Sequence, residues 1–266
     1  MNRECDRTLW VCALFISSCL SAVLLLSGVA FAADEALEIM KEVENRALTE
    51  SQSYEGAIEV IDAKGKVLNK SWHFWREGNR GNSKVLVRFD TPAEVRGVGL
   101  LTLNHAGRNA EQWLYTPAIQ RDRRIAPQEK SQRFMGTDFT NEDMEERAIE
   151  NYDYTLIGEE MIAGQTCHKI KAVYRASGNT QYSHIYLWVR KDIAAVIQAE
   201  LYVSGKLAKM LRWDDWKRVQ SIWTAHFVEM KDLSRGSTTR IRSSNVRYDV
   251  KFEPEWFSLR NLRRVP

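Results

Sequence analysis

Short alternating segments recur at regular intervals along this 266-residue chain. Polar and apolar residues alternate within each segment, and turn-forming stretches such as residues 63–66 and 204–206 separate most of them. This pattern is typical of half-buried β-strands joined by hairpins. A single twisted sheet with so many strands must curl. The sequence therefore predicts a large curled antiparallel sheet, with strands at residues 54–61, 67–76, 84–90, 100–104, 112–116, 152–161, 167–174, 182–189, 196–202, 207–216, 222–230 and 238–250.

Two segments depart from this alternation, and we expect them to fill the interior of the curl. Residues 34–48 predict an amphipathic helix, whose apolar face carries Ala36, Ile39, Met40, Val43 and Ala47. Residues 127–150 contain few β-branched residues and many charges, which favours a helix or a lid. Within them, Thr140 and Asp143 have the spacing of a capping box.

Four acidic residues crowd the start of this predicted central helix: Glu142, Asp143, Glu145 and Glu146. Carboxylates in the first turns of a helix interact favourably with its dipole, so we expect a solvated helix start. A metal site is the alternative interpretation, because carboxylate oxygens also bind hard cations.

The N-terminus has the organisation of a secretory signal. Arg3 and Arg7 precede an apolar run over residues 9–29, and Ala30-Phe31-Ala32 provides a small-x-small cleavage site. We therefore predict a signal peptide at residues 1–32 and a single exported domain at residues 33–266. An uncleaved anchor is the alternative, because the apolar run is long enough to cross a bilayer.

The composition of the predicted exported domain excludes two classes of protein. Its charge stays at the +3 of the full chain, because the signal contains as many acidic as basic residues. This near-neutral balance does not indicate a nucleic-acid-binding protein. Cys167 is the one cysteine outside the signal, so the domain cannot depend on an internal disulfide. We expect Cys167 to be a small buried apolar residue.

Common catalytic and cofactor motifs are missing from the sequence. It contains no Gly-x-Ser-x-Gly, His-Glu-x-x-His, Walker or Gly-x-Gly-x-x-Gly motif. Histidines occur singly and without a second ligand at metal-binding spacing, at positions His73, His105, His168, His184 and His226. We therefore expect no cofactor, no metal and no enzymatic activity of a common type.

A distinctive block runs from Trp113 to Met144. It contains an aromatic stretch over residues 113–117, an arginine cluster over residues 120–125 and the turn Met135-Gly136-Thr137-Asp138-Phe139. Together with residues 89–92, 97–101 and 256–258, it resembles the LolA-like outer membrane lipoprotein-sorting family of periplasmic proteins. The resemblance implies an incomplete antiparallel β-barrel with helices (α+β), wrapped over an N-terminal helix and a central helical lid. It also implies an apolar cavity between these layers and a Gram-negative periplasm as the location.

Residues of this block and of two earlier strands are candidates for the binding site. We expect apolar side chains to line the cavity, although ordinary sheet core is the alternative for each of them. This set consists of Trp72, Phe74, Leu101, Trp113, Tyr115, Met135 and Phe139. Arginines that could bind a lipid phosphate are Arg121, Arg123, Arg124 and Arg133, with a solvated edge strand as the alternative. Gly136 is the expected hinge of a lid over residues 126–149.

The leading functional hypothesis is a monomeric carrier. It would hold the acyl chains of a lipid or lipoprotein, contact membranes transiently and move its cargo toward the outer membrane. By the same resemblance, an inner-membrane transporter, for example of the RND type, would supply the cargo. Two alternatives remain: a lipid hydrolase with a dispersed Ser/His/carboxylate set, and a non-catalytic accessory subunit that docks on a transporter.

Overall fold

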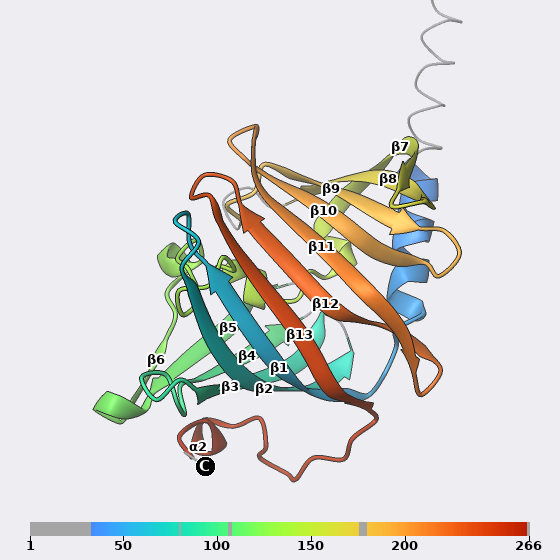
Figure 1. Ribbon diagram of the computed structural model, residues 1–266. Helices are drawn as coiled ribbons and strands as arrows, with labels where there is room; N and C mark the ends of the chain where they lie inside the picture. Colours follow the sequence, from blue (N-terminus) through green and yellow to red (C-terminus); the bar gives the residue numbers. More distant parts are fainter. Residues whose placement is uncertain (1–32, 80, 106–107, 176–179, 265–266) are drawn as a thin grey trace, which may run out of the picture.

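A computed structural model describes residues 33–79, 81–105, 108–175 and 180–264. Within these ranges, thirteen strands form one antiparallel sheet (Figure 1). The first six are β1 (Ser51–Ile61), β2 (Val67–Asn79), β3 (Asn82–Thr91), β4 (Gly99–His105), β5 (Arg108–Thr116) and β6 (Arg121–Arg124). The others are β7 (Tyr152–Ile162), β8 (Gln165–Tyr174), β9 (His184–Arg190), β10 (Ala195–Val203), β11 (Lys206–Val219), β12 (Ile222–Asp232) and β13 (Ser237–Tyr248).

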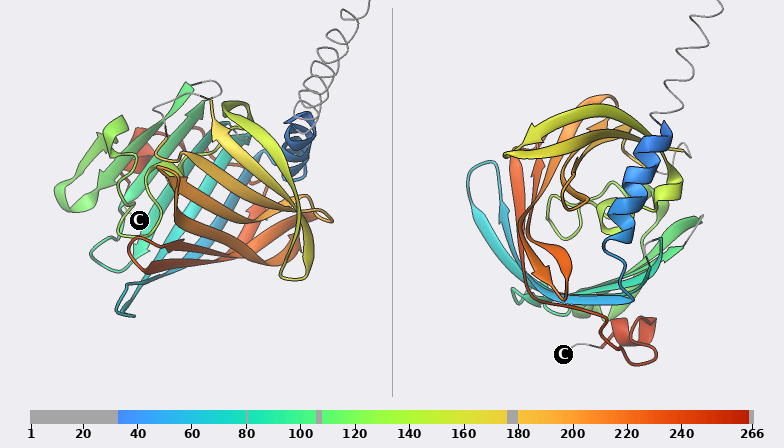
Figure 2. Two further views of the ribbon diagram at one scale, coloured as in Figure 1. Left: turned by 90° about the horizontal axis from the view of Figure 1, so that it is seen from above. Right: turned by 90° about the vertical axis from the view of Figure 1, so that its right-hand side faces the viewer.

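The strand order is β6-β5-β4-β3-β2-β1-β13-β12-β11-β10-β9-β8-β7. Neighbouring strands are consecutive in the chain except at the centre of the sheet, where β1 pairs with β13 and Ile58 lies opposite Ile241. The two edge strands, β6 and β7, are consecutive in the chain, and residues 125–151 connect them. We call this connection the plug, because the sheet curls around it and around the N-terminal helix (Figure 2).

The expectation of a mainly β, open and curled antiparallel sheet with an N-terminal helix is confirmed. The helix is present over residues 33–45, and Ala36, Met40 and Val43 pack into the core formed by β7 to β12. The predicted signal peptide lies outside the described residues. In the part of the chain that the structure covers, no helix has the length and apolar character needed to cross a membrane.

The prediction of a central helical lid is wrong. The plug contains three short 3-10 turns, η2 (Pro127–Glu129), η3 (Glu142–Met144) and η4 (Ile149–Asn151), and no α-helix. Thr140 and Asp143 do exchange the hydrogen bonds of a capping box. The turn nevertheless ends at Glu145, whose backbone is extended. The acidic side chains bind distant parts of the fold instead of solvent, with Glu142 bound to the Gln181 backbone and Asp143 to Lys209 of β11.

Two apolar clusters cover the concave face of the sheet. One lies beneath the N-terminal helix, and the other lies beneath the plug and includes Trp72, Phe89, Leu100 and Phe134. Gly56 allows the indole of Trp72 to lie across β1, because a Cβ at residue 56 would be 2.1 Å from its Nε1 atom. The described residues do not show the predicted apolar cavity, because the plug fills this position.

A third apolar cluster lies on the convex face. The C-terminal segment after β13, including α2 (Leu259–Leu262), packs there against Leu86, Leu101 and Tyr115. Adjacent residues of β4 therefore belong to opposite faces, with Leu100 on the concave face and Leu101 on the convex face.

Candidate functional site

A small hairpin in the plug presents polar groups to the concave face. Arg133 and Thr140 form an isolated β-bridge, and the Phe134 N–H donates to the Phe139 carbonyl over 2.8 Å. Gly136 occupies the turn with φ of +76°, a conformation that favours glycine, and its carbonyl accepts from Arg133 Nη2 at 2.7 Å. The hairpin therefore has a defined shape, although the hinge role of Gly136 stays a prediction.

Asp138 projects from this hairpin into the sheet and is fully buried. Thr239 Oγ1 of β13 donates to its carboxylate over 2.7 Å and accepts from its backbone N–H over 2.8 Å. Ser237 donates to the other carboxylate oxygen, and Arg133 forms an ion pair with it at 3.1 Å. Ser237 and Thr239 reach the same carboxylate because residues two apart on a strand share one face.

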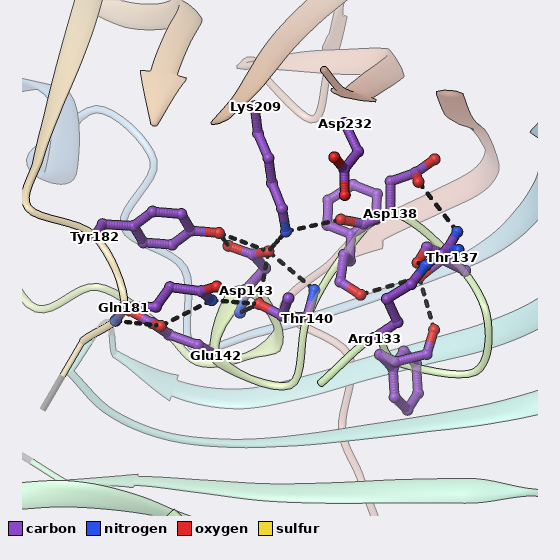
Figure 3. Close-up of polar contacts among 12 residues, drawn as sticks. Arg133, Thr137, Asp138, Thr140, Glu142, Asp143, Gln181, Tyr182, Lys209 and Asp232 are labelled. Carbon is purple, nitrogen blue, oxygen red and sulfur yellow. Dashed lines mark hydrogen bonds and ion pairs between the residues drawn. The ribbon is translucent and has the colours of Figure 1, made fainter. Parts of the chain in front are cut away.

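Asp143 forms the second ionic centre, shown in Figure 3. Its side chain is 2% exposed and forms ion pairs with Lys209 Nζ at 2.9 Å and Arg147 Nη2 at 3.0 Å. Tyr182, just before β9, donates its hydroxyl proton to this carboxylate over 2.9 Å. Burial would raise the pKa of Asp143, but Lys209 and Arg147 hold it below its ordinary value. Asp143 is therefore ionised, and its charge is compensated.

Lys209 joins the two centres. Its Nζ donates to the Asp138 backbone carbonyl and to the Asp143 carboxylate, both over 2.9 Å. Burial raises the pKa of the Tyr182 hydroxyl, and the neighbouring Asp143 adds to this effect, so Tyr182 stays a proton donor. Glu142 fixes the other side of the plug by accepting from the Gln181 N–H over 3.0 Å.

Lys70 of β2 also lies beneath the plug and is 7% exposed. Its Nζ donates to the Met135 carbonyl of the plug hairpin. Burial lowers the pKa of Lys70, and the nearby Arg133 cation lowers it further. Among the residues described by the structure, no carboxylate forms an ion pair with this ammonium group, so the sheet holds a buried cation without a formal counterion.

The predicted cavity residues lie on both faces of the sheet. Trp72, Phe74, Met135 and Phe139 pack in or against the concave cluster beneath the plug. The other three predicted residues, Leu101, Trp113 and Tyr115, lie on the convex face with the C-terminal segment. The structure therefore brings together the first group and separates it from the second.

The predicted arginine set is also divided. Arg121, Arg123 and Arg124 lie on the short edge strand β6, where Arg123 pairs with Glu129 at 2.8 Å and Arg124 pairs with Glu111 at 3.6 Å. The acidic neighbour on the same strand, Asp122, pairs with Arg263 instead. Arg133 belongs to the plug and binds Asp138.

Several residues of the ionic network were not predicted from the sequence. Lys70 and Lys209 occupy core-facing positions in strands whose neighbouring inward residues include Trp72 and Leu211. The sequence does contain a sign of them, because each lysine stands at a position of an alternating strand where an apolar residue is expected. The expectation of a solvated acidic helix start is wrong, because the side chains of Glu142 and Asp143 are buried and bound.

We also searched the described residues for a metal site, a catalytic triad and a pocket. They contain no group of three or more His, Cys, Asp or Glu side chains arranged to hold a metal ion. His73 contacts Asp90 and His184 contacts Ser183, but no histidine in the described ranges contacts both a serine hydroxyl and a carboxylate. A pocket of about 40 Å³ beside the plug is lined mainly by polar and charged residues, including Asn104, Lys130 and Glu145.

Comparison with solved structures identifies relatives across most of the chain. A DUF1329 family protein from Desulfovibrio piger is 28% identical, with a TM-score of 0.83, and the match covers 87% of this chain and 99% of that one. A "putative outer membrane lipoprotein-sorting protein domain" from Vibrio parahaemolyticus is 27% identical, with a TM-score of 0.83 and coverage of 87% and 100%. The LolA superfamily protein NE2245 from Nitrosomonas europaea shares the fold at 18% identity, with a TM-score of 0.68 and coverage of 85% and 98%.

Comparison with sequences gives a family but no curated relative. No curated protein matches the chain. A family model with the description "Uncharacterized protein" matches residues 81–264, which is more than half of the chain. The chain therefore belongs to the family that this model describes, and it shares its fold with a lipoprotein-sorting domain and with a LolA superfamily protein.

Proposed function

We propose that this protein is a periplasmic carrier for the acyl chains of a lipid or lipoprotein. Two findings support the proposal: the LolA-like fold, and the relative from Vibrio parahaemolyticus whose description refers to lipoprotein sorting. The observation that carries it is the plug itself. Phe134, Met135 and Phe139 pack on the apolar concave face, yet the segment that bears them has little regular secondary structure.

Acyl chains would replace these three plug side chains on the concave face. Returning them to water would cost about 5–9 kcal/mol, at about 1.5–3 kcal/mol for each side chain. Burial of about fifteen methylenes would contribute about 12 kcal/mol. Relative to water, one acyl chain therefore exceeds the apolar cost of opening the plug.

The remaining parts of the proposal follow the resemblance. Residues 1–32 would direct export, and residues 33–266 would act as a monomer that contacts membranes transiently. An inner-membrane transporter, for example of the RND type, would donate the cargo, and the outer membrane would receive it. Arg121 is exposed on the edge strand β6 and forms no ion pair within the described residues, so it is the arginine of that strand most available to a lipid phosphate.

Native mass spectrometry of gently purified residues 33–266, before and after solvent extraction, tests the carrier function. We expect the native protein to retain a lipid and Phe139→Asp to lose it, because a carboxylate on the concave face disfavours acyl chains. Phe252→Asp is the matched control, since Phe252 is a half-buried phenylalanine on the convex face. It should retain the lipid if circular dichroism shows that it folds.

A lipid-free mass that stays unchanged after incubation with phospholipid vesicles would contradict the carrier proposal. Equal lipid retention by Phe139→Asp and Phe252→Asp would instead contradict the assignment of the acyl site to the concave face. Phe139→Ala provides a second variant if Phe139→Asp fails to fold, with partial loss of lipid as the expected result.

A further inference from the structure

Two buried lysines of the sheet take their polar partners from the plug. Lys209 of β11 is 5% exposed and pairs with the Asp143 carboxylate, and Lys70 of β2 binds the Met135 carbonyl. Lys209 also binds the Asp138 carbonyl, so the two lysines hold the same plug hairpin. Any movement of the plug would remove the partners of both cations together.

Three hydroxyl groups complete this set of donors. Ser237 and Thr239 of β13 donate to the Asp138 carboxylate, and Tyr182 donates to the Asp143 carboxylate. All five donors lie outside the plug and face the concave side. Four of them donate to the two plug carboxylates, and the fifth, Lys70, donates to the Met135 carbonyl of the plug. The fold therefore presents a preformed group of donors whose present acceptors, two carboxylates and a backbone carbonyl, all belong to the plug.

A lipid that replaced the plug would cover these donors again. A neutral lipid would leave Lys70 and Lys209 buried without an anion, which is strongly unfavourable. A phosphate group would restore the missing acceptors, because its oxygens bind ammonium and hydroxyl donors in charge-assisted hydrogen bonds. The concave face thus favours a cargo that combines acyl chains with an anionic headgroup.

We propose that Lys70, Lys209, Ser237, Thr239 and Tyr182 form a headgroup site for the phosphodiester of an anionic phospholipid. Asp138 and Asp143 occupy this site in the closed protein and imitate the phosphate. The arrangement makes opening of the plug and binding of the headgroup an exchange of one anion for another. This inference rests on the proposed carrier function and names its cargo class.

Binding of two lipids with identical acyl chains, phosphatidylglycerol and diacylglycerol, tests the site. We expect the native protein to bind phosphatidylglycerol about tenfold more tightly or better, as one or two charge-assisted hydrogen bonds would give. Lys70→Met should weaken this preference severalfold while diacylglycerol still binds, because Lys209 and the hydroxyl donors remain. Lys66→Met is the matched control, because Lys66 is exposed in the turn between β1 and β2 and should leave the preference unchanged.

The thermal midpoint of the lipid-free variants separates a binding role from a structural one. Lys70→Met should unfold at the same or a higher temperature than the native protein, because it removes a buried charge without an ion-pair partner. Ser237→Ala combined with Thr239→Val provides a second set of variants and should also reduce the preference. A lower midpoint for Lys70→Met together with an unchanged lipid preference would overturn the proposal.

Three outcomes for the native protein would also contradict parts of the proposal. Equal affinity of the native protein for both lipids would overturn the headgroup site and leave the carrier function intact. Failure of both lipids to bind would overturn the carrier function for free lipids as well. Stabilisation by inorganic phosphate to the same degree as by phosphatidylglycerol would show that the site takes free phosphate, which would overturn its assignment to a lipid.

Discussion

Individual residues beneath the plug combine burial with charge in a way that ordinary sheet core does not. Lys70 and Lys209 both occupy positions on the core-facing side of a strand, where apolar residues are expected. A buried cation is tolerated when its partner is also buried, as Asp143 is for Lys209. Lys70 lacks a carboxylate partner among the described residues, and its ammonium group instead binds the Met135 carbonyl and lies 5.9 Å from the centroid of the Phe89 ring.

Asp143 should make the stability of the protein depend on pH. Its pKa in the folded state is below the ordinary value, so its stabilising contribution is complete above about pH 4 and decreases as the pH falls toward the folded-state pKa. Asp143→Asn should lower the free energy of unfolding at pH 7 by about 3–5 kcal/mol, because Lys209 and Arg147 then lose their shared counterion. Urea denaturation at pH 7 and pH 3 measures both effects.

Asp214→Asn is the control for this substitution. Asp214 forms an exposed ion pair with Arg212 at 3.5 Å, so its loss should change stability by less than about 0.5 kcal/mol. If Asp143→Asn and Asp214→Asn unfold at the same urea concentration, Asp143 does not anchor the plug. If acid weakens Asp143→Asn as steeply as the native protein, another carboxylate is responsible for the pH dependence.

At the scale of elements, the strands could be predicted and the plug could not. Each predicted strand corresponds to an observed one, because alternation depends only on which face is buried. β6 consists of Arg121–Arg124 and carries no apolar alternation, so it was recognisable only as a possible solvated edge. The helix at residues 33–45 was clear from its apolar face.

The plug was misread because its charges have distant partners. Glu142 binds the Gln181 backbone, and Asp143 binds Lys209, so neither side chain is available to support a longer solvated helix. Similarly, the sequence showed that Trp113 and Tyr115 share a face but not which face it is. The C-terminal segment decides this by covering them on the convex side. Contacts between segments far apart in the chain do not change the local alternation of polar and apolar residues, so this alternation cannot predict them.

The plug should open more easily than the sheet around it. Its hairpin is closed by few backbone hydrogen bonds, including those from Phe134 to Phe139 and from Asn141 to Gln132. Hydrogen exchange followed by mass spectrometry should therefore show faster exchange in residues 131–144 than in β1 and β13. Added phosphatidylglycerol should accelerate exchange in the plug further. If the amides of the plug exchange only when those of β1 and β13 exchange, the plug is a permanent part of the core and does not open separately.

At the scale of the whole molecule, the sheet has two faces with different coverings. The N-terminal helix and the plug cover the concave face, and the C-terminal segment covers part of the convex face (Figure 2). The plug also connects the two edge strands, because β6 precedes it and β7 follows it in the chain. Its displacement would therefore affect both edges of the open barrel at once.

The pairing of β1 with β13 has a consequence for the folding kinetics. Strands β1 to β6 and strands β7 to β13 are two series of local hairpins, whereas the contact of Ile58 with Ile241 closes a loop that contains almost the whole sheet. Closing a long loop costs more entropy than forming a hairpin, so this seam should form last. Pulsed hydrogen exchange during refolding should protect β2, β3, β9 and β10 before the amides shared by β1 and β13. Protection of the seam in the earliest phase would mean that the two halves assemble on each other instead of folding separately and then joining.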